Sequence, residues 1–201
     1  MKLHNDILQK SPEWYALRLK HPLTASNAQA IGNAGKGLET LCMEQMAEKH
    51  SKTPKKQYTN EDLERGVELE EEARTIYQME TGNQVIEIGF VTNEEISKVG
   101  GASPDGLVND DGLLEVKCFA NTKHFVMTLE GLKIEPKYMW QMQMQMLFTG
   151  RDWVDFVAYN PNYNKSILIQ RVVVDEVKRQ KILVGLKVGE KILEDINKKV
   201  K

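Results

Sequence analysis

Apolar residues recur every three or four positions in several stretches of the chain, a spacing that places them on one face of an α-helix. Two of these stretches begin at recognisable caps: Ser11 precedes Pro12, and Asn60 precedes a long acidic run that ends near Gly82. The expected helices cover residues 11–19, 38–49, 60–82, 122–131, 135–150 and 175–197, with a further helix start at 23–26. Gln141 and Gln145 are four apart and share one helix face. The side chains expected to pack in the core include Trp14, Leu17, Met43, Val177 and the methionines at 139, 142, 144 and 146.

From Gln84 onward the apolar residues alternate with polar ones, which is typical of β-strands. The expected strands are residues 84–93, 98–106, 113–119, 151–161 and 165–174. Asn109 to Gly112 (NDDG) consists of turn residues and predicts a tight hairpin. This order of elements predicts an α/β fold in which a mixed sheet of about five strands is flanked by helices.

The length of 201 residues fits one domain with a sizeable core, and no repeat or low-complexity segment divides it. We therefore expect a single domain over 1–201, with a core over roughly 11–174 and a C-terminal helix at 175–197. The glycines of residues 32–37 predict a flexible loop. Residues 51–60 carry three lysines and predict either a solvated linker or a basic rim for DNA.

Composition narrows the class of protein. A hydrophobic content of 41% and a charged content of 28% are ordinary for a soluble globular protein. The net charge of −2 excludes a polybasic binder, so nucleic acid would have to be held by local basic groups or by enclosure. Cys42 and Cys118 lie too far apart to suggest a zinc or iron–sulfur site. The absence of an apolar leader or an 18-residue apolar run favours a cytoplasmic protein without membrane contact.

The candidate chemistry lies around the predicted hairpin, in the stretch SPDGLVNDDGLLEVK. Glu115 and Lys117 are two apart in a strand and share a face, and the hairpin folds Asp105 back towards them. Two carboxylates and an ammonium in this arrangement suit Mg²⁺ or Mn²⁺. Such an ion can activate water and offset charge on a phosphodiester, while Lys117 orients that water. An ordinary hairpin with a surface Glu–Lys ion pair is the alternative for this short pattern alone.

The flanking sequence favours the first interpretation. SPDG followed by GLLEVKC resembles the core of the PD-(D/E)xK nucleases, and most of all their lambda exonuclease branch, the YqaJ-like viral recombinases. The resemblance continues in the same order through SPEWYALRL, LTAS, ELEEEARTIYQMETG and YMWQMQMQM, and so covers roughly residues 11–160. It implies a restriction-endonuclease-like core.

The resemblance also assigns expected roles to residues. Asp105, Glu115 and the carbonyl of Val116 would hold Mg²⁺, with Mn²⁺ as a substitute, and Lys117 would position the attacking water. Glu70 and Gln141 match the helix-borne acid and glutamine that complete the family's site, although acidic runs such as 68–72 are usually surface charge. The residues that match the 5′-phosphate contacts are Arg18, Ser26 and Ser103; the gap between the first two is one residue longer than in the closest pattern.

The implied activity is Mg²⁺-dependent 5′-to-3′ digestion of one strand of double-stranded DNA from its ends. The 3′ single strand would then serve a strand-annealing protein in phage-type recombination, in a bacterial host cell and encoded by a phage or prophage. The family further suggests a homotrimeric ring around DNA. Two alternatives remain: a related PD-(D/E)xK endonuclease or repair nuclease, and a catalytically silent DNA-end-binding scaffold.

Overall fold

A five-stranded mixed sheet forms the centre of the computed structural model, which describes residues 1–53 and 61–200 and omits the side chains of 61–68. The strands lie in the order β3 (Val85–Ile86), β6 (Gly106–Val108), β7 (Gly112–Cys118), β8 (Trp153–Tyr159) and β9 (Ile167–Val173). Strands β7 and β8 are parallel and all other neighbours are antiparallel. The predicted α/β class with a mixed sheet is confirmed.

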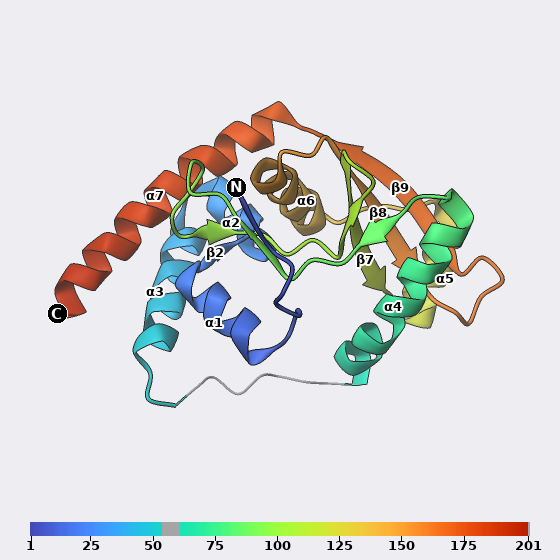
Figure 1. Ribbon diagram of the computed structural model, residues 1–201, viewed down its shortest axis with the longest axis horizontal. Coiled ribbons are helices and arrows are strands. Elements are labelled where there is room, and N and C mark those ends of the chain that lie inside the picture. Colours follow the sequence, from blue (N-terminus) through green and yellow to red (C-terminus); the bar gives the residue numbers. More distant parts are fainter. Residues whose placement is uncertain (54–60, 201) are drawn as a thin grey trace.

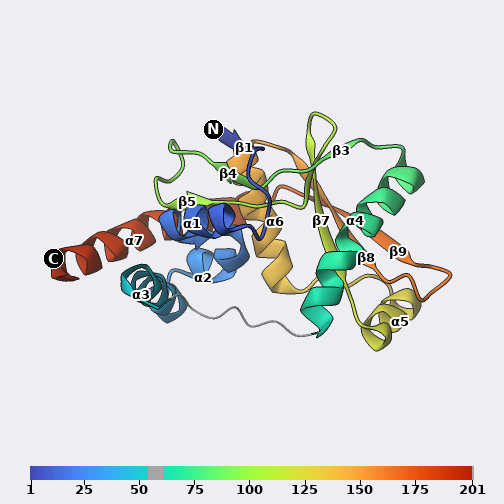
Figure 2. The same cartoon turned by 60° about the horizontal axis from the view of Figure 1, so that its bottom comes forward.

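Helices cover both faces of this sheet (Figures 1 and 2). Helix α4 (Glu61–Thr81) packs on one face, while α6 (Pro136–Thr149) packs on the other and is preceded by α5 (Asn121–Glu130). The remaining helices gather beside α6 and are α1 (Pro12–Lys20), the 3₁₀ turn η1 (Ala25–Asn27), α2 (Ala28–Asn33), α3 (Lys36–His50) and α7 (Glu176–Val200).

Alternation along β7 divides the core in two. Leu113 joins the cluster packed under α6, while Leu114 and Val116 join the one packed under α4. Residues 112–116 are all buried, because both faces of this strand are covered. Glu115 points to the same face as Leu113, so its carboxylate lies within the α6 side of the core.

Two further pairs of short strands lie outside the main sheet. β1 (Lys2–His4) pairs with β4 (Phe90–Thr92), and β2 (Leu23–Thr24) pairs with β5 (Gly100–Gly101). The prediction that residues 84–93 and 98–106 form two continuous strands of the main sheet was therefore wrong. The reason lies in their glycines: a Cβ on Gly89 would come within 1.8 Å of the Ile7 carbonyl oxygen. The N-terminal segment around Ile7 crosses there in contact with the Gly89 backbone, and it occupies the place that a neighbouring strand of the main sheet would take.

The predicted flexible loop at 32–37 was also wrong. Helix α2 continues to Asn33 and α3 begins at Lys36, so the connection consists of Ala34, in the left-handed conformation, and Gly35. Of the predicted loop at 51–60, residues 54–60 lie outside the described residues, as does the predicted cap Asn60. None of the described helices combines the length and the apolarity that crossing a membrane requires.

Several side chains predicted to be packed are not in the core. Met43 on α3 and Val177 on α7 are exposed, and Trp14 and Leu17 on α1 are only half-buried. By contrast, the predicted methionine packing on α6 is confirmed for Met142, Met144 and Met146, which are buried, while Met139 is half-buried and packs against the same core.

Close backbone contacts fix α2 between α6 and α7. A Cβ on Gly32 would lie 2.3 Å from the Trp140 ring of α6, and a Cβ on Gly185 would lie 1.8 Å from the Ile31 carbonyl oxygen. Only glycine permits these approaches. Through them, η1 and α2 are held at a fixed distance from α6.

Candidate active site

The hairpin between β6 and β7 brings Asp105 beside Glu115, as the sequence predicts. Asn109 adopts a left-handed φ of 45° in the turn, a conformation that asparagine tolerates. The Asp105 amide donates to the Leu114 carbonyl at 3.0 Å, and the Val116 amide donates to Asp105 Oδ2 at 2.7 Å. These two bonds hold the Asp105 carboxylate against the backbone that carries Glu115.

Both oxygens of the Glu115 carboxylate are held by donors. Gln141 Nε2 donates to Oε1 at 2.7 Å and Gln145 Nε2 donates to Oε2 at 2.6 Å. The Lys117 ammonium also contacts Oε1. Glu115 is 0% exposed, so these charge-assisted hydrogen bonds replace its hydration and fix the orientation of its carboxylate.

The Lys117 ammonium contacts two of the three groups predicted as metal ligands, Glu115 and the Val116 carbonyl. Its Nζ contacts Glu115 and donates to the Val116 carbonyl at 3.0 Å, and it lies 5.4 Å from the Tyr138 ring centroid. Burial acts to lower the pKa of Lys117, but the negative charges of Glu115 and Asp105 outweigh burial and raise that pKa overall. Lys117 is therefore a fixed cation in this site.

Negative charge still exceeds positive charge around Asp105. Burial raises the pKa of Asp105 well above its usual range, and the neighbouring Glu115 and Glu70 add to this effect, against the opposing charge of Lys117. We call Asp105, Glu115 and Glu70 with Lys117 the carboxylate cluster. Among the described residues no group of three or more His, Cys, Asp or Glu forms a ready-made metal cage. The cluster nevertheless fits Mg²⁺, which uses one or two carboxylates and takes its other ligands from water and substrate.

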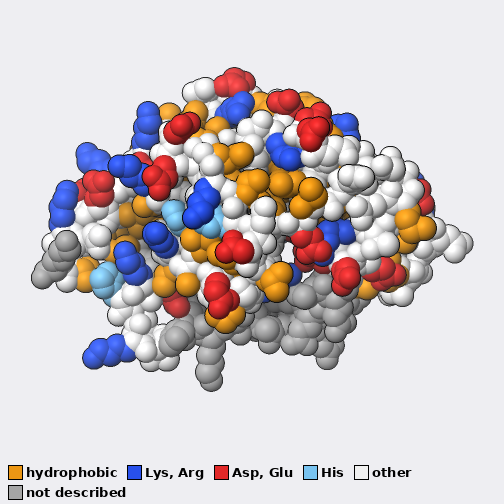
Figure 3. Space-filling view, in the orientation of Figure 1, with side chains coloured by type: hydrophobic (Ala, Val, Ile, Leu, Met, Phe, Trp, Pro, Cys, Tyr) orange, Lys and Arg blue, Asp and Glu red, His pale blue; other side chains and the backbone are white. Residues whose placement is uncertain are grey.

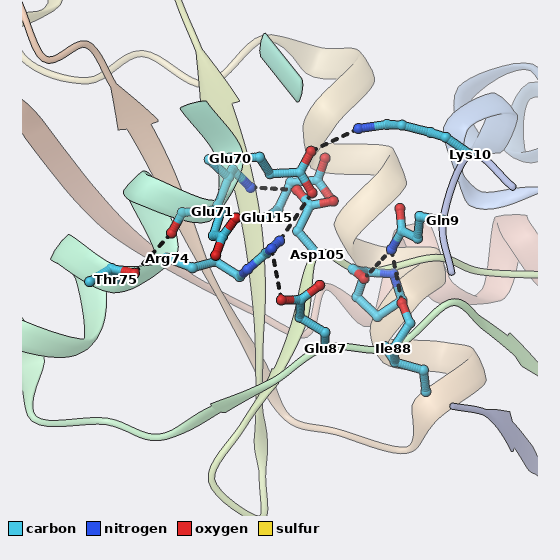
Figure 4. A network of polar contacts seen from close by, with 12 residues as sticks. Gln9, Lys10, Glu70, Glu71, Arg74, Thr75, Glu87, Ile88, Asp105 and Glu115 are labelled. Atoms are coloured by element: carbon cyan, nitrogen blue, oxygen red, sulfur yellow. Dashed lines mark hydrogen bonds and ion pairs between the residues drawn. The ribbon is translucent and has the colours of Figure 1, made fainter. Parts of the chain in front are cut away.

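Glu70 reaches the cluster from α4, as expected from the resemblance. Its carboxylate forms ion pairs with Lys10 at 2.9 Å and Arg74 at 3.2 Å, and Arg74 is also paired with Glu87 at 2.9 Å (Figure 4). A cavity of about 270 Å³ opens here and is lined by Lys10, Glu70, Arg74, Glu87 and Asp105 among others. In Figure 3, acidic side chains gather beside a hollow near the centre of the molecular face.

Lys10 adopts an unusual backbone conformation. Its φ of 67° lies in the left-handed region, which costs a side chain other than glycine about 1–2 kcal/mol. The Lys10–Glu70 ion pair is solvent-accessible, with the Lys10 side chain 42% exposed, and pairs of this kind contribute about 0–1 kcal/mol. The ion pair alone therefore does not offset the cost of the backbone conformation.

A second group of polar residues forms around Trp14. Arg18 donates to Thr24 Oγ1 at 3.2 Å and to Ser26 Oγ at 3.1 Å, and its guanidinium lies 4.4 Å from the Trp14 ring centroid. The Trp14 indole donates to Ser103 Oγ at 2.9 Å. We call Arg18, Thr24, Ser26 and Ser103 the Arg18 pocket; it contains all three residues expected to bind a 5′-phosphate.

Burial lowers the pKa of the Arg18 guanidinium from its ordinary value. Because the ordinary pKa of arginine is far above neutral, the guanidinium still carries its charge at neutral pH. The surrounding hydroxyls can donate to an anion as well as accept from Arg18. The pocket therefore offers one fixed positive charge and rotatable donors, a combination suited to a phosphate group.

Ser103 connects the two groups. Its hydroxyl belongs to the Arg18 pocket, while its carbonyl accepts a long hydrogen bond of 3.4 Å from Gln145, whose Nε2 also donates to Glu115. Gln145 is 0% exposed, and its Oε1 has no hydrogen-bond partner among the described residues. It is a polar acceptor buried beside the carboxylate cluster.

Sequence reasoning gave no role in either group to three contributors: Lys10, Trp14 and Gln145. Gln141 and Gln145 are four positions apart, which places them on one helix face. This spacing was the feature of the sequence that could have indicated that Gln145 lies beside Glu115 as Gln141 does. Trp14 was assigned to packing by its apolar spacing, whereas its indole nitrogen bridges the Gly89 carbonyl and Ser103.

The fold and the arrangement of Asp105, Glu115 and Lys117 are those of the PD-(D/E)xK nuclease class. The model of the YqaJ-like viral recombinase domain matches residues 13–152. The chain therefore belongs to the YqaJ-like viral recombinase family.

Solved structures extend this assignment. The chain is similar to an alkaline exonuclease (LHK-Exo) from Laribacter hongkongensis, with 33% identity, a TM-score of 0.80, and coverage of 94% of this chain and 98% of that one. The same enzyme in complex with dAMP matches with a TM-score of 0.79. A phage-related exonuclease from Haemophilus somnus 129PT, at 15% identity, shares the fold with a TM-score of 0.64 and coverage of 89% and 96%. A search of curated proteins finds no match.

Proposed function

We propose that this protein is a Mg²⁺-dependent exonuclease that digests one strand of double-stranded DNA in the 5′-to-3′ direction. The observation that carries this proposal is the connection through Ser103, which joins a phosphate-type pocket to a cluster of carboxylates. The similarity to an alkaline exonuclease over nearly the whole chain supports the same activity.

In this proposal Asp105, Glu115 and the Val116 carbonyl hold Mg²⁺, for which Mn²⁺ can substitute. The bound ion supplies Lewis-acid chemistry, because it offsets charge on the phosphodiester and acidifies water. Glu70 and Gln141 complete the site. Gln141 and Gln145 keep the Glu115 carboxylate in one orientation, and the Lys117 ammonium positions the attacking water.

The Arg18 pocket selects the end of the strand. Arg18, Ser26 and Ser103 bind the terminal 5′-phosphate, so the next phosphodiester lies at the carboxylate cluster. Water attacks this phosphorus and loses a proton, and the bond to the 3′-oxygen of the terminal nucleotide breaks as that oxygen takes up a proton. The new end again carries a 5′-phosphate, which the same pocket can bind.

The biological setting follows from the same chemistry. A 3′ single strand remains after digestion, and a single-strand annealing protein is the partner that would use it in phage-type recombination. We place this activity in the cytoplasm of a bacterial host, encoded by a phage or prophage. A homotrimeric ring around DNA would explain how a chain with a net charge of −2 retains its substrate.

Digestion of linear duplex DNA with Mg²⁺ tests the proposal. The substrates are a 5′-phosphorylated end, a 5′-hydroxyl end and a closed circle, and Lys117→Ala is assayed in parallel. We expect nucleotides to be released fastest from the phosphorylated end, circles to be spared and the variant to be inactive. Cut circles would favour a related endonuclease or repair nuclease. DNA binding without cleavage under any divalent metal would favour a silent end-binding scaffold.

A further inference from the structure

The N-terminal segment, residues 5–10, forms one wall of the cavity beside the carboxylate cluster. Gln9 Nε2 donates to the Ile88 and Pro104 carbonyls, each at 2.9 Å, and Pro104 immediately precedes Asp105. The Ile7 carbonyl lies so close to Gly89 that no side chain fits there. The segment is therefore fixed relative to Asp105, and the residue that follows Gln9 has a defined place (Figure 4).

That residue is Lys10, in a conformation that glycine adopts without cost. The turn into α1 needs this backbone conformation, yet it needs no side chain. The exposed ion pair with Glu70 offsets less than the conformation costs, so folding alone does not explain a lysine here. A positive charge at this position is better explained by a ligand.

The other groups of the cavity indicate the class of that ligand. Arg74 is paired with both Glu70 and Glu87, so two carboxylates already offset its single positive charge. Lys10 is paired with Glu70, and an ammonium carries three donors, so it can keep this partner and bind a second anionic oxygen. The cavity is also lined by Ile7, Leu8 and Ile88, which offer apolar surface next to that charge. A site that combines a cation with apolar surface fits a nucleotide strand, which has both charged and apolar parts, better than it fits a small free anion.

We propose that Lys10 binds a backbone phosphate of the DNA strand that enters this cavity, at a contact separate from the Arg18 pocket. The inference rests on the proposed function, because it requires DNA to reach Asp105. Lysine binds phosphate as a point charge and tolerates different strand geometries. The contact is therefore independent of base sequence.

The test measures DNA binding without turnover, in a Lys117→Ala background, as a function of salt concentration. Lys10→Gly, Lys10→Ala and Lys10→Met each remove the charge. We expect each to make the slope of log affinity against log salt shallower by about 0.7–0.9, the value for one phosphate contact. Lys133→Ala, which removes an exposed lysine remote from the cavity lining, should leave the slope unchanged.

Thermal unfolding separates this role from a structural one. Lys10→Gly relaxes the backbone, so it should melt at or above the temperature of the parent while it loses the contact. An unchanged salt slope in all three Lys10 variants, or a shallower slope seen only in variants that melt lower, would overturn the proposal. Digestion of phosphorylated ends by the protein with Lys117 intact, together with an unchanged slope in the Lys10 variants, would refute the Lys10 contact alone. A protein with Lys117 intact that neither binds nor cuts DNA would refute the proposed function as well.

Discussion

The carboxylate cluster and the Arg18 pocket lie close together but are built in opposite ways. The cluster is centred on the fully buried Glu115, whose two oxygens are held by Gln141, Gln145 and Lys117. In the Arg18 pocket, the Thr24 and Ser26 hydroxyls contact each other and the Arg18 guanidinium, and the Ser103 hydroxyl accepts from the Trp14 indole. The first has excess negative charge that a metal ion would offset. The second has hydrogen bonds that can be exchanged for those of a phosphate.

In the proposed function, this difference separates the chemistry of cleavage from the selection of the substrate. Changes in the carboxylate cluster should affect cleavage at every kind of end, because they alter groups that act on the reacting bond. Changes in the Arg18 pocket should affect which end is cut and leave the intrinsic chemistry intact. The following predictions test this division, from the largest expected effect to the smallest.

Lys117→Ala should cause the largest loss. Removal of the ammonium leaves the buried Glu115 and the half-buried Asp105 without their fixed cation and, in the proposed function, the attacking water without its positioning group. We expect nucleotide release from linear duplex to fall about 10³-fold or more, equally for phosphorylated and hydroxyl ends. A loss confined to phosphorylated ends would contradict the division between the two regions.

Arg18→Ala should instead change the preference between ends. A hydrogen bond to a charged group contributes about 1.5–3 kcal/mol, so digestion of phosphorylated ends should slow about 10- to 100-fold. Digestion of hydroxyl ends should change little. Arg18→Lys keeps the charge without the planar fork and serves as the matched control, with an intermediate preference expected. Equal slowing at both kinds of end would place Arg18 in the chemistry instead.

Gln145→Met should weaken metal binding. The substitution conserves volume but removes the donor that holds Glu115 Oε2, and loss of such supporting hydrogen bonds costs about 10- to 100-fold in metal affinity. Titration of the Mg²⁺ requirement and direct calorimetry with Mn²⁺ measure this effect. Gln143→Met is the control on the same helix, because Gln143 bonds the backbone of Val173 and Asp175. It should lower stability without altering metal affinity; a shift in metal affinity common to both variants would argue against a specific role of Gln145.

The smallest expected effect is the change in stability, and in its pH dependence, that Asp105→Asn causes in the absence of metal. The raised pKa means that the folded protein binds this proton more tightly than the unfolded chain does. The stability contributed by the proton is present at low pH and is lost as the pH rises through the folded pKa. At pH 8 without divalent metal the variant should therefore melt higher, by about 2–4 °C for each kcal/mol gained.

Asp111→Asn, at an exposed turn position, is the control and should melt as the parent does. The order of melting temperatures should reverse with saturating Mg²⁺, which the parent binds more tightly. If the parent were more stable than Asp105→Asn at pH 8 without metal, the folded protein would stabilise the ionised form of Asp105, and the expectation would be wrong.

The two regions also differ in how far the sequence predicted them. Asp105, Glu115 and Lys117 lie within thirteen positions on one hairpin, so turn residues and strand alternation were enough to bring them together. Arg18 and Ser26 are eight positions apart, but Ser103 comes from a distant part of the chain, and the proximity of all three was expected only from the resemblance. The contributions of Lys10 and Trp14 depend on tertiary contacts with Glu70 and Ser103, which no local pattern reveals.

The same limit explains the errors in the sheet. Alternation in 84–93 and 98–106 was correctly linked to extended backbone, but alternation does not identify the pairing partner. That choice was made by long-range contacts at Gly89, where the N-terminal segment crosses.

The glycine contacts that hold α2 against α6 and α7 have a consequence for the product. Gly32 lies against the Trp140 ring of α6 and so limits how closely α2, which directly follows the η1 turn that carries Ser26, approaches the helix that carries Gln145, while Gly185 fixes α2 against α7. If one end of the substrate is held at the Arg18 pocket and cut at the carboxylate cluster, this separation acts as a molecular ruler. Each cut then removes a fragment of the same length, and the regularity of the fragments is determined by packing remote from the reacting atoms.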